Sequence, residues 1–436
     1  MRPMNETKTD SVSLLYDIHD TPKTVKELLI YAFQQLMAVF VATVLIANIC
    51  GTPVSSCLFG AGLGTIIYQL ITGFNSPMFI SSCGATCSAV IGALAMSADG
   101  SYTPVVIGGF IIFCVYAAFA LVIRLRGITA VNKVFPPVVV GATTMVIGLN
   151  LASFIPSYVQ VNGGYNIWGV LVAIATMFVI ALCSHYFKGF LKTIPFLIGL
   201  VFGYIAASIL TLTGCAKLID FSLFKTGKVF ALPDFTFLKL SAFSGGFKGI
   251  AELLALFVPV AVCAVLEHYS DHKVLSRMIG TDLTQNPGLD RTLIADGAAS
   301  FAGTLLCGLP NTSYGESIAT TGFSRVASVK VIFAAALMLI VLSFVAPVQA
   351  FILSVPSCVF GGCAMILYGY IAVSGFKTLM TSGADFTSNK TMIIVSVILT
   401  VGVSGVWLFS ESFAGVSLAM VIGAVLNIAL KDKQEK

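Results

Sequence analysis

The chain has 436 residues, of which 57% are hydrophobic and only 10% are charged, whereas soluble globular domains carry about 25% charged residues. This composition excludes an ordinary soluble domain and indicates that lipid surrounds most of the surface. The net charge of +5 does not indicate nucleic-acid binding, because no basic patch interleaved with aromatic residues lies outside the apolar segments.

The N-terminal tail, residues 1–27, is polar and contains no short apolar core followed by a small-residue cleavage site. We therefore expect no removable signal peptide, and the first apolar segment should remain in the membrane. The 11 cysteines are scattered, mostly inside apolar segments, which argues against a disulfide framework or a zinc site. No metal and no cofactor are expected.

Windows of about 20 residues, the length of a helix that crosses a bilayer, predict an all-α membrane protein with 14 spans. The expected spans lie near residues 28–50, 54–73, 78–96, 103–123, 134–155, 166–187, 193–213, 249–270, 292–308, 311–324, 329–347, 352–375, 391–409 and 412–430.

The distribution of basic residues predicts the orientation. If the N-terminus is cytoplasmic, 19 of the 24 lysines and arginines face the cytoplasm. The other five lie in the one long external connection, residues 214–248, and long loops translocate largely regardless of charge. Both termini are therefore expected in the cytoplasm.

The chain repeats itself once. Phe135–Gly141, at the start of the fifth span, recurs as Val355–Gly361 at the start of the twelfth. More weakly, Phe79–Ala85 in the third span resembles Pro310–Glu316 in the tenth. In both cases the matching spans are seven spans apart. Because seven is an odd number, the two halves enter the membrane in opposite directions, as in the inverted repeats of secondary transporters. The alternative is chance similarity between helix starts rich in proline and glycine.

Spans three and ten are short and open with small polar residues, including Ser82 and Gly84 in one and Asn311 and Gly315 in the other. Two interrupted segments at matching positions indicate a binding site near the membrane midplane. Free backbone groups and half-helix N-termini there suit a flat, hydrogen-bonding ligand. The alternative is a pair of kinks whose polar groups are satisfied by neighbouring helices.

Acidic side chains within the spans cost roughly 2.5–3.5 kcal/mol each at the bilayer centre unless they have a partner or a role. They are Glu252, Glu267, Asp271, Asp296 and Glu316. Glu252 begins its span and is interpreted as a helix cap. Asp296 is interpreted as a structural partner for a polar group on a neighbouring helix. Glu267 lies deeper and is predicted to be functional.

Asp271 follows Glu267 by one helical turn on the same face, so the two carboxylates could share or relay a proton. Asp271 could instead form an ion pair with Lys273 or Arg277 at the cytoplasmic end of the span.

His268 and His272 are further candidates to carry a proton at neutral pH, although a histidine near a helix end is more often a capping or interfacial group. The sequence contains no HExxH, no Gly-x-Ser-x-Gly and no Cys/His metal spacing, so an intramembrane enzyme is not predicted. The inverted repeat with two broken spans argues against a channel.

Three places in the chain resemble the nucleobase-ascorbate transporters, also called nucleobase:cation symporter-2, and within them the bacterial uracil permeases. They are Glu267-His268, the loop Asn286–Arg291, and Pro310–Glu316 followed by Arg325. The resemblance implies seven plus seven inverted spans, with short antiparallel strands in spans three and ten. It implies a core domain (28–123 and 249–347), a gate domain (134–213 and 352–430), and a homodimer in the bacterial inner membrane.

The resemblance also implies roles for individual residues. Glu267 and Glu316 would accept hydrogen bonds from the ring N–H groups of a nucleobase. Backbone N–H groups around Cys83, Gly84, Tyr314 and Gly315 would face its carbonyl oxygens. The implied function is import of uracil with a coupling proton.

The chain departs from the family signature at Ser317, Ala319 and Ser324, where asparagine, glycine and threonine are usual. Bacterial uracil permeases also commonly carry a histidine where this chain has Asp271. These departures keep xanthine or another purine open as the substrate, and Asp271, His272 and His268 open as proton carriers. Outside the family, the rival is an anion carrier of the related sulfate-transporter fold, which the two glutamates disfavour electrostatically.

Overall fold

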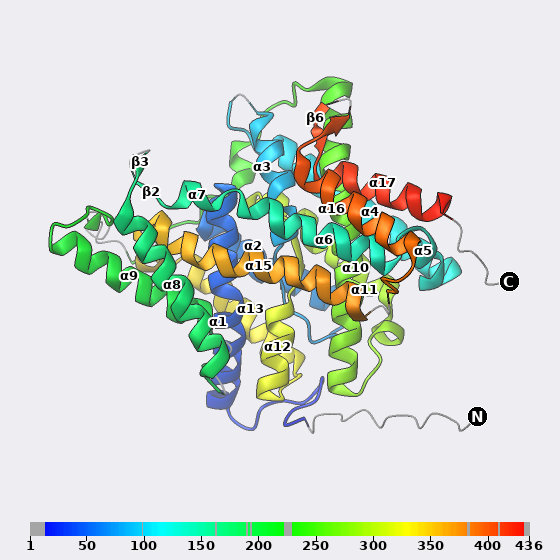
Figure 1. The fold of residues 1–436 in the computed structure, drawn as a ribbon. Helices are drawn as coiled ribbons and strands as arrows, with labels where there is room; N and C mark the ends of the chain where they lie inside the picture. Colours follow the sequence, from blue (N-terminus) through cyan, green and yellow to red (C-terminus); the bar gives the residue numbers. More distant parts are fainter. Residues whose placement is uncertain are drawn as a thin grey trace.

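The computed structural model describes residues 14–97, 99–161, 164–188, 191, 194–221, 229–381, 384–408 and 410–430. The described chain is mostly helical (Figure 1), and eight of its helical segments are long and apolar enough to cross a membrane. They are α1 (Val25–Cys50), α2 (Val54–Thr72), α4 (Thr103–Arg126), α6 (Pro137–Ala152) continued by α7 (Ile155–Tyr158), α8 (Ile167–Tyr186), α9 (Pro195–Leu212), α10 (Gly246–Ile279) and α15 (Ser357–Thr381).

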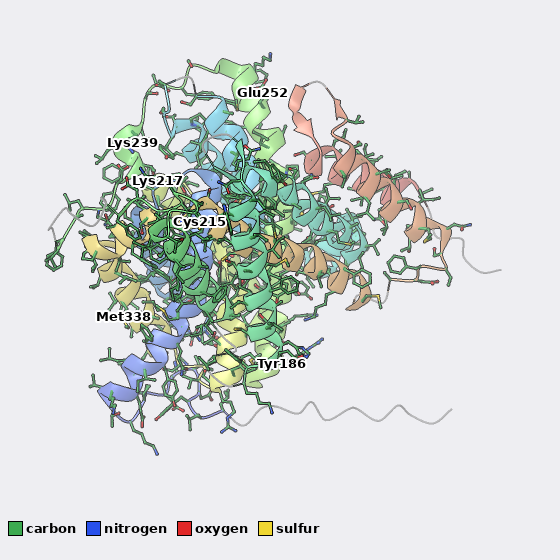
Figure 2. All side chains as sticks on the ribbon, turned by 60° about the vertical axis from the view of Figure 1, so that its left-hand side comes forward. Tyr186, Cys215, Lys217, Lys239, Glu252 and Met338 are labelled. Atoms are coloured by element: carbon green, nitrogen blue, oxygen red, sulfur yellow. The ribbon has the colours of Figure 1, made fainter. Side chains whose placement is uncertain are left out.

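Shorter helices complete the described fold. They are η1 (Gly84–Thr86) continued by α3 (Cys87–Ala95), α5 (Ile128–Val134), η4 (Thr236–Lys239), η5 (Thr284–Gly288), α12 (Gly315–Ser324), α13 (Val329–Ser343), α14 (Ala346–Ser354), α16 (Asn389–Ser404) and α17 (Val416–Ala429). α11 (Leu289–Cys307) is as long as α2 but less apolar. The predicted tail and external connection lie partly outside the described residues, which lack 1–13 and 222–228. Figure 2 shows Glu252 and Lys239 towards one end of the molecule and Tyr186 towards the other, where α1 begins.

Two short strands lie where spans three and ten were expected to be interrupted. β1 (Ile80–Ser82) pairs antiparallel with β4 (Asn311–Ser313), with Ser81 opposite Thr312. A proline shortly before each strand, Pro77 and Pro310, disfavours helix in the residue that precedes it. Both strands are fully buried, and each leads into a short helix, η1 with α3 or α12.

The helices pack in two groups. In the first, α11 lies against α2 and α4, α13 lies against α1 and α2, and α10 lies against α4. In the second, α15 lies against α6 and α8, α8 against α9, and α16 against α6 and α17. Glycines bring α6 and α15 close together: a Cβ on Gly375 would lie 2.5 Å from the Gly141 carbonyl oxygen. Small residues allow such close backbone contact in membranes.

Two further pairs of strands are short. β2 (Gln160–Val161) pairs with β3 (Gly164–Tyr165), and β5 (Trp407–Leu408) pairs with β6 (Ser410–Ala414). The β5–β6 hairpin connects α16 to α17, and β6 contacts α10. It therefore links the second helix group to the first.

Candidate functional site

A cavity of about 90 Å³ lies where β1 and β4 lead into their helices, which is room for a small ligand rather than for a single water. Its lining includes all six residues predicted to bind substrate, namely Glu267, Glu316, Cys83, Gly84, Tyr314 and Gly315. They come from α10, from the start of α12 and from the end of β1. The fold thus joins residues that are more than 200 positions apart in the sequence.

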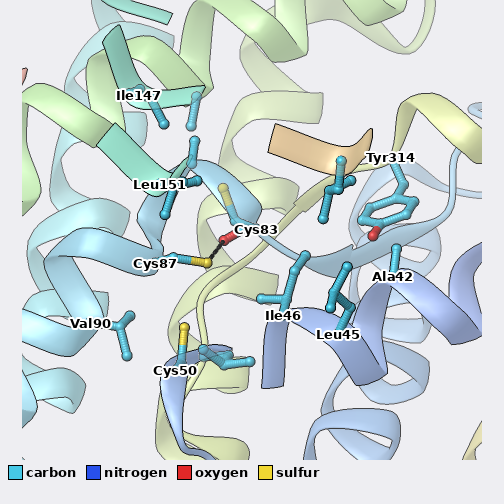
Figure 3. Packing of buried hydrophobic residues seen from close by; sticks show 14 of the residues in the cluster. Ala42, Leu45, Ile46, Cys50, Cys83, Cys87, Val90, Ile147, Leu151 and Tyr314 are labelled. Carbon is cyan, nitrogen blue, oxygen red and sulfur yellow. Dashed lines mark hydrogen bonds between the residues drawn. The ribbon is translucent and has the colours of Figure 1, made fainter. Parts of the chain in front are cut away.

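The remaining walls are largely apolar. Ile46 of α1, Ile147 of α6 and Ile371 of α15 line the cavity, and Figure 3 shows Ile46, Cys83 and Tyr314 in the packing around it. The second helix group therefore forms one wall, while both glutamates and the two strands lie on the side of the first group, where α12 contacts α1, β1 contacts α2 and β4 contacts α11. Apolar walls with a few fixed polar groups are typical of small-molecule sites.

The Glu267 side chain is exposed even though it lies midway along a largely buried stretch of α10, because it faces the cavity. Its carboxylate forms no hydrogen bond or ion pair with another residue that the structure describes. Glu316 lies in the first turn of α12, where a negative charge is stabilised by the helix dipole. Both carboxylates are thus placed to accept hydrogen bonds from a ligand.

The glycines at the two helix starts leave the backbone accessible. A Cβ on Gly315 would meet no atom within 4 Å, and one on Gly84 would meet only side-chain methyls of Ile371 and Ile46, at 3.5 and 3.7 Å. First-turn N–H groups have no partner within their own helix. The amides of Gly84 and Gly315 can therefore donate to acceptor oxygens in the cavity. The Cys83 N–H, predicted to face the ligand, instead donates to Pro310 O at 2.9 Å.

β1 is held by uncharged side chains of α2. The Thr65 hydroxyl donates to Ile80 O at 2.8 Å and accepts from Ile80 N at 3.0 Å. One turn further along α2, the Gln69 amide donates to Ser76 O at 2.9 Å and to Met78 O at 3.0 Å. Thr65 and Gln69 were not predicted from the sequence, although their spacing of four residues indicates one polar face of the helix.

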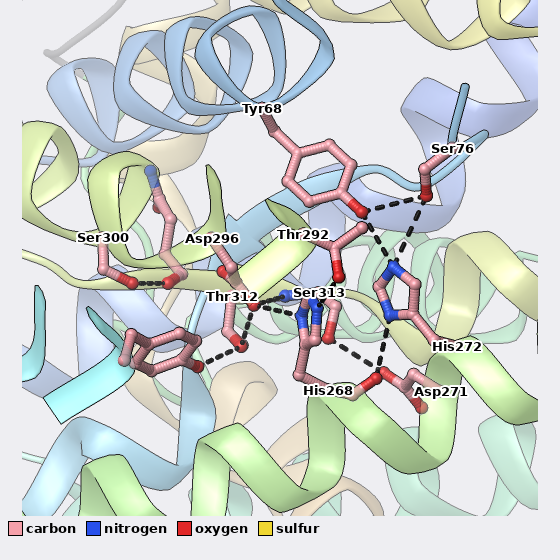
Figure 4. Close-up of polar contacts among 12 residues, drawn as sticks. Tyr68, Ser76, His268, Asp271, His272, Thr292, Asp296, Ser300, Thr312 and Ser313 are labelled. Atoms are coloured by element: carbon pink, nitrogen blue, oxygen red, sulfur yellow. Dashed lines mark hydrogen bonds and ion pairs between the residues drawn. The ribbon is translucent and has the colours of Figure 1, made fainter. Parts of the chain in front are cut away.

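β4 is held by Asp296 of α11. Its Oδ2 lies 2.6 Å from His268 Nδ1 and accepts from the Ser313 N–H and the Thr312 hydroxyl, both at 3.3 Å. Figure 4 shows these contacts converging on one carboxylate oxygen. Asp296 thus has polar partners on neighbouring elements, as predicted. They are the ring of His268 on α10, and β4, a strand that lines the cavity. His268 is fully buried, so it is not an interfacial group.

Asp271 contacts the same strand from α10. Its Oδ2 accepts from the Ser313 hydroxyl at 3.2 Å, and Ser313 lines the cavity. The alternative ion pair with Lys273 or Arg277 is absent among the described residues, and the Lys273 ammonium lies 4.9 Å from the centre of the Tyr269 ring.

His272 lies on another face of α10. Its Nδ1 donates to the His268 carbonyl oxygen at 2.8 Å, and its Nε2 lies 2.8 Å from the Tyr68 hydroxyl and 3.4 Å from the Ser76 hydroxyl. None of the predicted proton carriers, Asp271, His272 and His268, lines the cavity. Of the three, Asp271 alone hydrogen-bonds to a side chain that does.

Glu252 differs from its interpretation as a helix cap. α10 begins at Gly246, with Gly245 as the N-cap, so Glu252 lies in the second turn. There its carboxylate is 4.0 Å from the Lys248 ammonium. The helix begins six residues before Glu252, which is too far away for Glu252 to cap it.

The sequence matches a model described as "Permease family" over residues 26–411. The uracil permease of Bacillus caldolyticus is 36% identical over 425 residues, which cover 96% of this chain and 95% of that protein. The uracil permease of Bacillus subtilis (strain 168) is 34% identical, with 93% of each chain covered. The chain belongs to this permease family. A more distant relative of the permease, the putative pyrimidine permease RutG of Escherichia coli (strain K12), is 30% identical and covers 92% of this chain and 88% of its own.

Solved structures show the same fold at low sequence identity. The transmembrane domain of the cyanobacterial bicarbonate transporter BicA has a TM-score of 0.63 at 13% identity and covers 94% of the permease and 99% of its own chain. SLC26A9 has the same TM-score and identity, with 93% and 66% covered. The permease is therefore a multi-pass membrane protein whose fold is shared with these transporters.

Proposed function

We propose that the permease is a proton-coupled nucleobase symporter that imports uracil by alternating access. The observation that carries this proposal is the presence of two carboxylates, Glu267 and Glu316, beside glycine-flanked backbone amides in one small cavity. Relatives named uracil permeases, similar over nearly the whole chain, support the substrate class.

The chemistry of uracil fits this cavity. Uracil alternates N–H donors with C=O acceptors around a planar ring, so its site needs fixed acceptors next to fixed donors. Glu267 and Glu316 supply acceptors that form strong, charge-assisted hydrogen bonds. The amides near Gly84 and Gly315 supply donors, and the isoleucines on α1, α6 and α15 supply flat apolar contact.

We infer that Asp271 carries the coupling proton. Its link to Ser313 lets a change of charge at Asp271 act on β4 and so on the substrate site. His268 is occupied by Asp296, and His272 points to Tyr68 and away from the cavity. A proton on Asp271 would favour the conformation in which the core domain, with uracil bound, moves against the gate domain. Release of this proton to the cytoplasm would favour the return of the empty core domain.

For the architecture, we propose fourteen spans in two inverted halves of seven, with both termini cytoplasmic. The antiparallel pairing of β1 with β4 is what such a repeat requires at its centre. The two helix groups would be the core and gate domains, which move against each other around the cavity. A homodimer in the bacterial inner membrane completes the proposal.

Xanthine or another purine is the alternative substrate within the family, because the cavity chemistry suits any planar base with adjacent donors and acceptors. An anion carrier is disfavoured. Two carboxylates at the site would repel an anion that the helix N-termini attract.

Uptake into proteoliposomes tests the proposal. Radiolabelled uracil and xanthine are supplied with and without an imposed pH gradient, and the parent is compared with Glu316→Gln and with Glu252→Gln as a matched control outside the cavity. Uracil uptake driven by the gradient is expected in the parent and control. Glu316→Gln should lose it by at least about 100-fold, because the neutral amide keeps only one acceptor oxygen and loses the charge that strengthens the hydrogen bond to the ring N–H. Uptake of neither base, or normal uptake by Glu316→Gln, contradicts the proposal.

A further inference from the structure

A second cavity, of about 290 Å³, lies between the two helix groups. Ser88 of α3 and Val260 of α10 line it from the first group, and Asn150 of α6 and Val403 of α16 line it from the second. The residues around Gly415, at the start of α17, close one side. This cavity is distinct from the one that holds the glutamates, since no residue lines both.

The two cavities follow each other along the same helices. On α6, Ile147 lines the inner cavity and Asn150 lines the second one. On α10, Cys263 lines the inner cavity and Val260 lines the second. Each step is three residues, which is a rise of about 5 Å along a helix. The second cavity therefore continues the first by about one helical turn.

On all three elements the step leads in space from the inner to the second cavity. The residue numbers rise along this step from Ala85 to Ser88 and on α6, whereas they fall on α10. This is the pattern of antiparallel helices that pass one common axis. The other end of α10, with Leu275 and Ile279, packs in one cluster with Ile18 near the N-terminus. With a cytoplasmic N-terminus, the second cavity lies on the external side.

The lining of the second cavity suits an uncharged ring. Among the described residues that line it, none carries a charge, and the polar side chains are Ser88, Asn150 and Ser417. The Asn150 amide donates to Gly402 O at 3.0 Å, which leaves its carbonyl oxygen as an acceptor for a ligand N–H. An anion would find no basic side chain here, and a nucleobase would find apolar contact with one fixed amide.

We propose that this cavity is an outer chamber that holds the nucleobase between the external solution and the Glu267–Glu316 site. The inference rests on the proposed function for its ligand. The continuity along α6, α10 and the Ala85–Ser88 segment supports a single path from one cavity to the other. Asn150 would then bind the base first and release it inward by one helical turn.

Filling the chamber tests the proposal. Val403→Trp places a large side chain at a lining residue that is 55% exposed, and Ile393→Trp places the same bulk on α16 at a residue that is 43% exposed and does not line the chamber. Val403→Trp should lower external uracil uptake by about tenfold or more, while uracil binding by the detergent-solubilised protein changes by less than about twofold. Equal uptake by the two variants, or loss of binding together with uptake, overturns the proposal.

A labelling experiment separates this inference from the proposed function. Ser88→Cys in intact cells is treated with a membrane-impermeant thiosulfonate, and labelling at that residue is measured by mass spectrometry against the parent, which retains the native Cys87. Labelling from outside is expected. Its absence overturns the outer chamber even if uracil is transported. Labelling in a protein that transports no nucleobase shows an open chamber and overturns the proposed ligand instead.

Discussion

β1 with η1 and α3, and β4 with α12, provide the two sides of the cavity, yet different kinds of side chain hold them. β1 is fixed by a hydroxyl and an amide of α2, Thr65 and Gln69. β4 is fixed by an ionisable group of α11, Asp296, which also holds the His268 ring. A second ionisable group, Asp271, reaches β4 through Ser313.

We infer from this difference that the two segments have different tasks. Hydroxyls and amides keep the same hydrogen bonds at every pH, so β1 serves as a fixed reference. The contacts of β4 depend on the protonation of carboxylates and imidazoles. The proposed proton coupling needs one such responsive side, and we infer that it is the α10–α12 side of the cavity.

Removing the ionisable anchor of β4 should have the largest effect. Asp296→Ala leaves His268, the Ser313 N–H and the Thr312 hydroxyl without their buried acceptor. The side chains of Asp296 and His268 are both 0% exposed, and each buried hydrogen-bonding group left without a partner costs about 1–3 kcal/mol. We expect a large drop in the unfolding temperature of the detergent-solubilised protein.

Thr65→Val on the opposite strand is the matched comparison. Valine has nearly the shape of threonine, and the change removes the hydroxyl that bonds both Ile80 N and Ile80 O. An unsatisfied neutral group costs about 1–3 kcal/mol, so the shift should be clearly smaller than for Asp296→Ala. If the two variants unfold at the same temperature, the anchors are equivalent and the division of tasks is wrong.

A methyl group at Gly315 tests the α12 side of the cavity directly. The added Cβ meets no protein atom within 4 Å, so folding should be unaffected. It would occupy part of a cavity of only about 90 Å³. We expect the KM for uracil uptake to rise about tenfold with an unchanged unfolding temperature.

Gly369→Ala is the control for this substitution. Gly369 also lies in a helix, α15, with no atom within 4 Å of an added Cβ, but it does not line the cavity. Its KM should equal that of the parent. A normal KM for Gly315→Ala, or a raised KM for Gly369→Ala, would show that the α12 start does not limit the ligand space.

The six residues predicted from the sequence to bind substrate all line the cavity, but its apolar walls were not predicted. A carboxylate inside an apolar span is too costly to be incidental, which singled out Glu267, and small polar residues that interrupt a span marked the two helix starts. Helices also lie where hydropathy predicted them, as α2 (Val54–Thr72) and α8 (Ile167–Tyr186) show.

The partners of the polar groups could not be predicted in the same way. Asp271 and His272 are neighbours in sequence, but adjacent residues on a helix point about 100° apart. Which of them faces β4 depends on how α10 is rotated against its neighbours. The His268–Asp296 contact joins residues 28 positions apart, and only the packing of α10 and α11 brings them together.

The smallest expected effect concerns Asp99, a charged residue outside the membrane that follows α3 on the β1 side of the cavity. Asp99 follows α3, and hydrogen bonds, first of all from the Ser97 hydroxyl at 2.7 Å, lower the pKa of its carboxyl to about 2. A pKa below the unfolded value of about 3.9 means that the carboxylate stabilises the fold above about pH 4 and that this contribution is lost as the pH falls towards about 2. Asp99→Asn should therefore unfold at a slightly lower temperature than the parent at pH 5, and the difference should vanish near pH 2. If the difference in unfolding temperature instead stays constant between pH 5 and pH 2, the hydrogen bonds of Asp99 do not depend on its charge. The segment of β1, η1 and α3 would then be insensitive to pH at its external end as well.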